Sequence, residues 1–247
     1  AEAGRERGTL GSIWGYEREW RDTTLGYVKT APSTQVAMVI DPPDGRIPPL
    51  TAEAQARAAA ARGTFRAGRR PAEGPEDLSL FVRCITRGVP GMMMPSIYNN
   101  GLQIVQGPGN VAIQKEMIHE TRVIPTESRP ALGDTLTSWL GDTRGRWEGD
   151  TLVVETRNFN GRSPYRGSSE NLVLTERFTR VGETVLEYQF TMNDPTIWTS
   201  PWTGMFRFDK DDEQYELVEY ACHEGNYGMT NILSGARANE RAAESSR

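Results

Sequence analysis

Short runs of alternating apolar and polar residues, separated by tight-turn sequences, recur along the second half of the chain. Gly149-Asp150 precedes one run, Gly182-Glu183-Thr184 joins two others, and Lys210-Asp211-Asp212 precedes the last. Side chains alternate between the two faces of a strand, and short polar turns connect antiparallel neighbours. The pattern therefore predicts a mainly β protein with about six to eight sequential antiparallel strands.

An open meander of this kind leaves two edge strands unpaired, and closing the sheet on itself removes both edges. We therefore expect an antiparallel meander that closes into a lipocalin-like β-barrel. A barrel of about eight strands has an interior that holds one small ligand. A β-sandwich is the alternative architecture.

The other segments are expected to decorate this barrel within a single domain, residues 1–247. Residues 1–50 carry prolines that helices and ladders do not accommodate, which predicts an extended, proline-rich N-terminal arm. Residues 51–90 are expected to be helical, with an Ala-rich first helix and a second over Glu76–Ile85. The barrel would take residues 94–222, and residues 223–247 would form a loop and a C-terminal helix. The expected total is two or three short peripheral helices.

Composition narrows the classes of partner. Hydrophobic residues make up 37% of the chain, enough for one core, and no apolar stretch approaches the roughly 20 residues that span a bilayer. Membrane insertion is therefore not expected. The net charge is -5, and the Arg-rich stretch Arg62–Arg70 lacks aromatic platforms, so nucleic acid is not expected as a partner. The expected partner is a small molecule, and a homo-oligomer formed through the arm is left open.

The cysteines and the first residues favour export. Ala1–Gly4 is a small-residue start, typical of a mature protein after removal of a signal peptide. The two cysteines, Cys84 and Cys222, can form a disulfide in an oxidising compartment. Two unrelated buried thiols are the alternative. We expect the disulfide and a periplasmic or secreted location.

The alternation also predicts a cavity lining in which polar groups converge among apolar ones. On one face it places His119, Asn158, Glu176 and Tyr188, among leucines such as Leu186. A few polar groups in an apolar lining are typical of a small-molecule site. We expect Asn158 and Tyr188 to position a substrate there.

Both histidines of the chain precede a glutamate, in His119-Glu120 and His223-Glu224. Histidine titrates near neutral pH, so His119 is expected as a general acid or base and His223 as a second such group. Glu176 or Glu224 would orient an imidazole. If a metal binds, His119 and His223 with one carboxylate would hold it, although the spacing of a metalloprotease helix is absent. Hydrogen-bonded histidines without either role remain a third interpretation.

Further candidates come from two short motifs. In Pro95–Gly101, Tyr98 could polarise a substrate oxygen and Asn99 could recognise a carbonyl or hydroxyl group; a plain turn is the alternative. Trp198 and Trp202 could stack on a planar or sugar-like ligand, or simply cap one end of the barrel.

Several longer motifs resemble a broad family of exported bacterial proteins. The matching runs extend from about residue 36 to residue 237 and include VIDPPDGRIPPL, RCITRG, PSIYNNG, EMIHETRVIP, GRWEGDTLVVE, RGSSEN, ERFTRV and YACHEGNYG. The resemblance implies export, and it implies no particular reaction, cofactor or catalytic residue.

These observations lead to three functional hypotheses. The first is an exported enzyme that performs cofactor-independent acid–base chemistry, of the lyase, isomerase or cyclase type, on a small and largely apolar organic molecule. No nucleophile elbow, P-loop or dinucleotide fingerprint is present, so no cofactor is expected. The second is a non-catalytic periplasmic carrier of hydrophobic ligands. The third is a metal-dependent hydrolase or oxygenase that uses His119 and His223.

Overall fold

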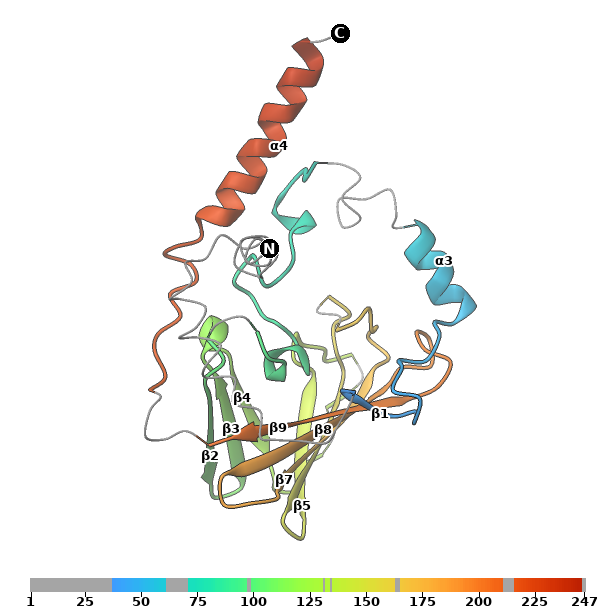
Figure 1. The fold of residues 1–247 in the computed structure, drawn as a ribbon, viewed down its shortest axis with the longest axis vertical. Coiled ribbons are helices and arrows are strands. Elements are labelled where there is room, and N and C mark those ends of the chain that lie inside the picture. Colours follow the sequence, from blue (N-terminus) through green and yellow to red (C-terminus); the bar gives the residue numbers. More distant parts are fainter. Residues whose placement is uncertain are drawn as a thin grey trace, which may run out of the picture.

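Two antiparallel sheets form the body of the protein (Figure 1). The computed structural model describes residues 37–60, 71–96, 99–130, 132–133, 135–162, 165–210 and 216–245. The six-stranded sheet has the order β1 (Val39–Asp41), β9 (Trp202–Asp209), β8 (Val185–Asn193), β7 (Val173–Arg180), β6 (Thr151–Arg157) and β5 (Asp142–Glu148). The three-stranded sheet consists of β2 (Leu102–Gly107), β3 (Asn110–Lys115) and β4 (Thr121–Pro125). The expectation of a mainly β, antiparallel protein is confirmed.

Tight turns occur at the positions that the sequence predicts. Strands β5 to β9 pair with their neighbours in chain order, and so do β2 to β4. Gly149 adopts φ +60° in the tight turn between β5 and β6, a conformation that glycine reaches without steric cost. Along β7, Leu174, Glu176 and Phe178 alternate with more exposed residues, so that every second side chain enters the interior.

The closed barrel is not confirmed. The hydrogen-bonded order of the described strands ends at β5 in one sheet and at β4 in the other. These two edges nevertheless approach closely, because a Cβ added at Gly145 would lie 2.8 Å from Ile124 Cγ2. The two sheets therefore meet by packing rather than through a shared ladder.

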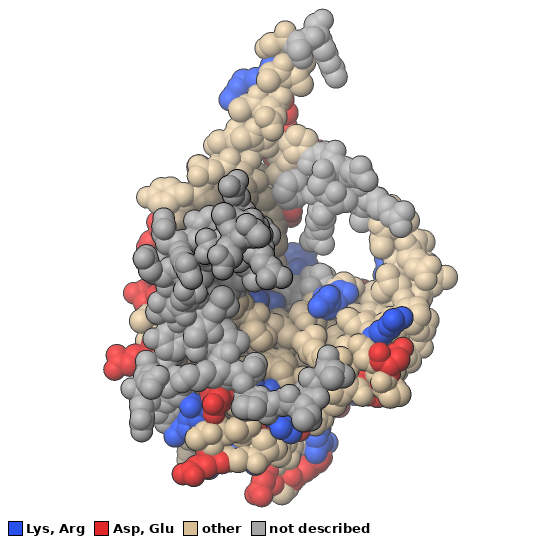
Figure 2. Space-filling model, in the orientation of Figure 1, with Lys and Arg blue, Asp and Glu red and all other residues tan. Residues whose placement is uncertain are grey.

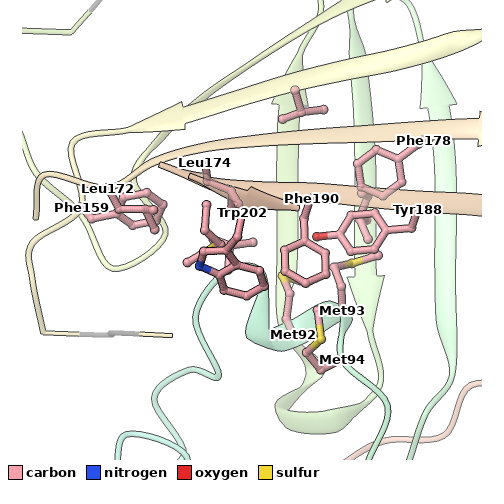
Figure 3. Packing of buried hydrophobic residues seen from close by; sticks show 14 of the residues in the cluster. Met92, Met93, Met94, Phe159, Leu172, Leu174, Phe178, Tyr188, Phe190 and Trp202 are labelled. Atoms are coloured by element: carbon pink, nitrogen blue, oxygen red, sulfur yellow. The ribbon is translucent and has the colours of Figure 1, made fainter. Parts of the chain in front are cut away.

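The core lies between the sheets and is rich in aromatic and methionine side chains (Figure 3). The ring of Phe190 lies 5.7 Å from that of Tyr188 and 5.6 Å from that of Trp202. Met92 and Met93, from the 3₁₀ turn Gly91–Met93, are fully buried against this cluster. Flexible thioether side chains fill the irregular space beneath rigid rings.

The N-terminal arm is described from residue 37 onward, where it runs along the six-stranded sheet. Strand β1 pairs with β9, and Leu50 forms an isolated bridge with Trp198. The Thr51 hydroxyl accepts a hydrogen bond of 3.1 Å from the Ala54 amide and caps helix α3 (Ala52–Ala60). The first expected helix is therefore present, and its continuation beyond residue 60 lies outside the described residues.

The second expected helix, over Glu76–Ile85, is wrong. This segment contains only a 3₁₀ turn, Pro75–Asp77, followed by further turns. Cys84 has φ +56°, which a helix does not permit, and the Val82 carbonyl accepts a hydrogen bond from the Asn226 side chain. A long-range contact thus takes an acceptor that a helix would have used.

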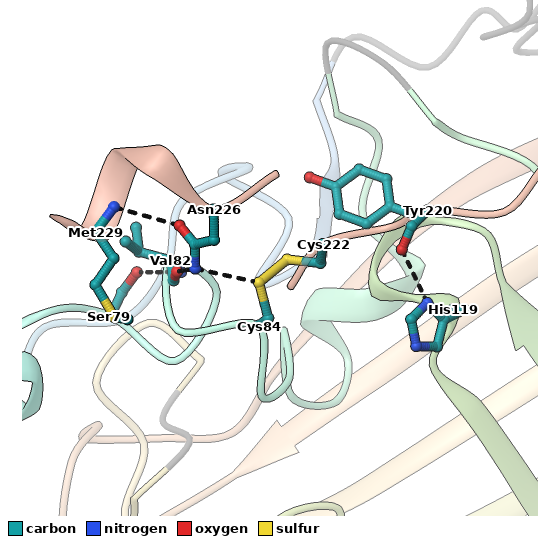
Figure 4. Close-up of a disulfide and its surroundings, with 8 residues drawn as sticks. All are labelled: Ser79, Val82, Cys84, His119, Tyr220, Cys222, Asn226 and Met229. Atoms are coloured by element: carbon teal, nitrogen blue, oxygen red, sulfur yellow. Dashed lines mark hydrogen bonds between the residues drawn. A yellow bond between two sulfur atoms is a disulfide. The ribbon is translucent and has the colours of Figure 1, made fainter. Parts of the chain in front are cut away.

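The disulfide between Cys84 and Cys222 is confirmed, and it joins residues 138 positions apart (Figure 4). Residues 216–222, expected as the last strand, form no strand but run toward this bond. Helix α4 (Tyr227–Ser245) follows and extends away from the sheets (Figure 1). Arg237 on α4 donates to the carbonyls of Ala72 and Glu73, each at 2.8 Å. Among the described residues, no helix combines the length and apolar character needed to cross a membrane.

A short turn interrupts the alternation of inward and outward side chains between β3 and β4. Residues Met117–His119 form a 3₁₀ turn between β3 and β4, with Ile118 at φ +63° and His119 at φ +41°. The turn reverses the inward and outward positions, so Arg122 is buried and Val123 is 58% exposed. The expected placement of His119 on the inward face is therefore wrong.

Candidate ligand-binding cavity

A cavity of about 1240 Å³ lies between the two sheets. The six-stranded sheet contributes Phe178 from β7, Leu186 from β8, and Phe206 and Phe208 from β9. The facing wall comes from β2 and β3 and includes Ile104, Val111 and Ile113. The rings of Phe206 and Phe208 lie 5.0 Å apart, so a continuous aromatic surface covers one side. Polar side chains, Gln103 and Gln114 among them, complete the lining, and a volume of this size suits a drug-sized organic molecule.

One end of the cavity carries a buried cation. Lys115 is the last residue of β3, shares the inward face of Val111 and Ile113, and is 1% exposed. Its Nζ donates a hydrogen bond of 2.6 Å to the main-chain carbonyl of Asn100, which also lines the cavity. Among the described residues, no carboxylate lies within ion-pair distance of this ammonium group. Lysine is rarely buried without such a partner.

The surroundings of Lys115 disfavour its charged form. The pKa of Lys115 is lowered from 10.5 to about 8, mainly by burial and also by the nearby positive charge of Arg87, while the negative charge of Glu116 partly opposes the shift. A substantial fraction of Lys115 is therefore neutral in mildly alkaline solution. Arginine does not offer this behaviour, because its guanidinium group stays protonated in proteins.

Polar contacts fix the wall behind Lys115. Glu116, 2% exposed, accepts a hydrogen bond from the Asn99 side-chain amide. Glu120 accepts hydrogen bonds from the Thr86 hydroxyl and from the Arg87 amide. Burial raises the pKa of Glu120, although these hydrogen bonds oppose the rise. The contacts hold Thr86, Arg87 and Asn99 against the end of β3 and the β3–β4 turn, next to Lys115.

Two arginines of the lining, Arg180 and Arg207, have partners of their own. Arg207 forms an ion pair of 2.8 Å with Glu187, and Arg180 donates to the carbonyls of Gly182 and Glu183. Over the described part of the face in Figure 2, acidic and basic side chains are interspersed. Lys115 thus differs from these cations in both burial and pairing.

The two histidines lie outside the cavity lining. His119 is exposed in the β3–β4 turn, where its Nδ1 lies 2.9 Å from the Tyr220 carbonyl oxygen (Figure 4). His223 and Glu224 are exposed in the loop before α4. His119 lies in a turn and not in a strand, so the alternation of strand side chains does not apply to it. Within the described segments, no group of three or more His, Cys, Asp or Glu residues could hold a metal ion.

Glu176 is fully buried, but its partners are not imidazoles. It forms an ion pair of 2.6 Å with Arg122 from β4, and it accepts a hydrogen bond of 2.9 Å from the Tyr188 hydroxyl. Burial raises the pKa of Tyr188 well above its ordinary value, and the Glu176 charge adds to the rise. The expected role of Glu176 in orienting a histidine is therefore wrong, since its side chain links the two sheets instead.

The remaining candidates have mainly structural contacts. Asn158 donates to the carbonyls of Gly133 and Leu136 in the loop before β5. Trp198 and Trp202 pack edge to face at 5.7 Å in the core, away from the cavity lining. Tyr98 lies outside the described residues.

Sequence reasoning missed Lys115, the residue that the structure singles out. Val111, Ile113 and Lys115 have the same parity in the alternating run, so the pattern contained the signal. The rarity of lysine was a second signal, because only Lys29, Lys115 and Lys210 occur among 28 basic residues. The prediction instead favoured histidine, because histidine titrates near neutral pH.

Comparison with protein-family models gives no match to this chain, and comparison with curated proteins gives none either. Functional inference therefore rests on the chain's own residues and geometry.

Proposed function

We propose that the protein binds a small, largely apolar organic molecule in the cavity between its sheets. The observation that carries the proposal is the apolar surface that Phe178, Leu186, Phe206 and Phe208 form within the lining, together with Ile113 of the other sheet. The volume of about 1240 Å³ is larger than packing defects in a well-filled core. Of the three functional hypotheses, the carrier needs only this cavity.

Two finer features belong to the same proposal. The sheets act together as an open barrel, supported by the close packing of Gly145 against Ile124 and by the ion pair between Arg122 and Glu176. The protein works in an exported, periplasmic or secreted setting. Its disulfide supports that location, because such bonds persist in oxidising compartments.

A dye titration tests binding at this place. The neutral apolar dye N-phenylnaphthylamine should bind saturably with a rise in fluorescence. Leu186→Glu puts a carboxylate into the apolar wall and should weaken binding about tenfold or more, because the bound dye would desolvate that charge. Val123→Glu, on the outer face of β4 where the side chain is 58% exposed, is the matched control and should leave binding unchanged. Equal effects of the two variants, or no saturable binding to the wild type, would refute the proposal.

Lys115 favours a second candidate function, the acid–base enzyme. A lysine whose pKa lies at about 8 supplies both a proton donor and a proton acceptor near neutral pH. In this version Lys115, rather than either histidine, is the titrating group at the substrate. Lyase, isomerase and cyclase steps all need such a group beside an apolar substrate.

Proton exchange distinguishes the enzyme from the carrier. The apolar ketone 2-acetylnaphthalene can be incubated with the protein in deuterated buffer, and exchange of its methyl protons can be followed by NMR. An acting base accelerates exchange, and Lys115→Met abolishes the acceleration. Binding of the ketone without accelerated exchange would support the carrier and exclude base catalysis on this ketone.

A further inference from the structure

The first observation is that Lys115 is a lysine in a chain whose basic residues are almost all arginines. The chain has 28 basic residues, and only three of them are lysines. The ion pairs that join two described residues use arginine, including the buried pair of Arg122 with Glu176. A lysine stands, however, at the inner end of the cavity, on the same strand face as Val111 and Ile113.

The second observation is the incomplete environment of its charge. The Lys115 ammonium donates to one neutral oxygen, the Asn100 carbonyl, and makes no ion pair within the described part of the chain. Glu116 is near enough to interact with it electrostatically, but its carboxylate is bound by Asn99. A buried cation with a single neutral acceptor is energetically unfavourable, and an anion beside it would remove much of that penalty.

The third observation is the contrast between Lys115 and another cation of the lining, Arg207. Arg207 is already paired with Glu187, and its side chain is partly exposed to solvent, whereas Lys115 is buried. Phe178, Phe206 and Phe208 line the space in between. The aromatic rings thus give the cavity an apolar stretch, and the lining also includes the acidic residues Asp150, Glu183, Asp209 and Glu216. Among the described residues, none of these carboxylates pairs with the buried Lys115 ammonium group.

We propose that the cavity takes an anionic amphiphile, a molecule with an apolar body and one carboxylate, whose carboxylate pairs with Lys115. The inference rests on the proposed function and names the ligand class for the same cavity. The carboxylate enters first and replaces the Asn100 carbonyl as acceptor for the Lys115 ammonium. The apolar body lies along Phe178, Phe206 and Phe208, and its far end approaches Leu186.

Linkage gives this arrangement a characteristic pH dependence. A carboxylate beside the ammonium favours its charged form, so binding raises the pKa of Lys115. By reciprocity, the carboxylate binds best while Lys115 is protonated, and its affinity falls as the pH rises above about 8. A neutral ligand of the same shape shows no such fall.

Displacement of N-phenylnaphthylamine by decanoate and by decanol tests the pairing, since the two ligands share a chain and differ in the head group. Wild-type protein should bind decanoate about tenfold or more tightly than decanol at neutral pH. Lys115→Met should bind the dye and decanol normally and lose the preference for decanoate. Lys115→Arg should keep a preference for the anion and lose its decline in alkaline solution, because arginine does not deprotonate. Arg157→Met, an exposed charge on β6, is the control and should change nothing.

A measurement on the unaltered protein guards against misfolded variants. With ¹³C at lysine Cε, the three lysines give three resolved signals, and that of Lys115 should titrate at higher pH when decanoate is bound. Equal binding of decanoate and decanol by the wild type, or an unmoved Lys115 titration in the presence of bound decanoate, would overturn the inference and leave the apolar cavity standing. Failure of the dye to bind would instead refute the proposed function.

Discussion

Arg122 on β4 and Glu176 on β7 join the two sheets through an ion pair of 2.6 Å, with side chains only 3% and 0% exposed. Arg122 also donates to the Thr156 hydroxyl at 2.7 Å, and Tyr188 donates to Glu176 at 2.9 Å. Because the described strands share no ladder between β4 and β5, this polar cluster is a main specific link between the sheets. Because the cavity lies between these sheets, loss of this polar cluster should change the shape of the cavity.

Removing one member of this pair leaves a charge buried without its partner. Arg122→Met should lower the free energy of unfolding by about 3–5 kcal/mol, measured by denaturant titration. The double variant Arg122→Met with Glu176→Leu removes both charges and should be more stable than the sum of the single effects predicts. Strict additivity of the two substitutions would show that the pair is not coupled.

Gly204 on β9 faces the ring of Phe190 on β8, and an added Cβ would overlap that ring. Gly204→Ala should therefore destabilise the fold by about 1–3 kcal/mol through overpacking. Gly182→Ala is the matched control, because its Cβ would approach only Val185, at 3.5 Å, and should change stability by less than about 0.5 kcal/mol. Thermal unfolding of the two variants checks the difference, and a neutral Gly204→Ala would contradict the packing described here.

How far sequence reasoning succeeds depends on the range of the interactions. The turns at Gly149 and Gly182 and the alternation along β7 are local signals, and strands follow them. The cysteines, with no others available to pair, indicated their disulfide directly. Closure of a barrel depends on two edge-to-edge pairings, that of β4 with β5 and that of β2 with the opposite edge of the six-stranded sheet, and no local pattern specifies either.

The site was harder to predict than the fold, for a comparable reason. A positive φ at Ile118 reverses the inward direction for everything that follows in β4, and this conformation is rare for a β-branched residue. The predicted His119 therefore turned outward and Arg122 turned inward. Lys115, which precedes the turn, kept the parity that alternation predicts.

The disulfide fixes residues 216–226 and the start of α4 to the turn around Cys84. Replacing both Cys84 and Cys222 with alanine should lower the free energy of unfolding by about 2–5 kcal/mol. Hydrogen exchange should also quicken around Asn226, whose side chain bonds to the Val82 carbonyl. Thiol counting on the denatured wild-type protein tests whether the disulfide is present. Detection of two free thiols without reductant would contradict it.

The pH dependence of the free energy of unfolding should reveal the lowered pKa of Lys115. Its pKa is lowered from 10.5 to about 8, so between these values the folded protein binds fewer protons than the unfolded chain. The free energy of unfolding therefore receives a contribution from Lys115 that rises with pH across this window. Lys115→Met lacks this contribution, and its stability relative to the wild type should decline by roughly 1–2 kcal/mol between about pH 7 and about pH 9.5.

Comparing the variant with the wild type at each pH cancels the titration of other groups, including Tyr188. Urea titrations at the two pH values provide the measurement. A relative stability that stays constant would show that Lys115 titrates as an ordinary exposed lysine, and a change in the opposite direction would show that folding raises its pKa. Either result would contradict the lowered pKa.

The most direct test of the central claim, that the cavity is a ligand site, is photolabelling with an apolar alkyl diazirine followed by peptide mapping. The account predicts labels within β7, β8 and β9, near Phe178, Leu186 and Phe206, and competition by excess N-phenylnaphthylamine. Labels confined to exposed apolar residues remote from the lining, such as Tyr227 and Ile232 on α4, and insensitive to the dye, would contradict it.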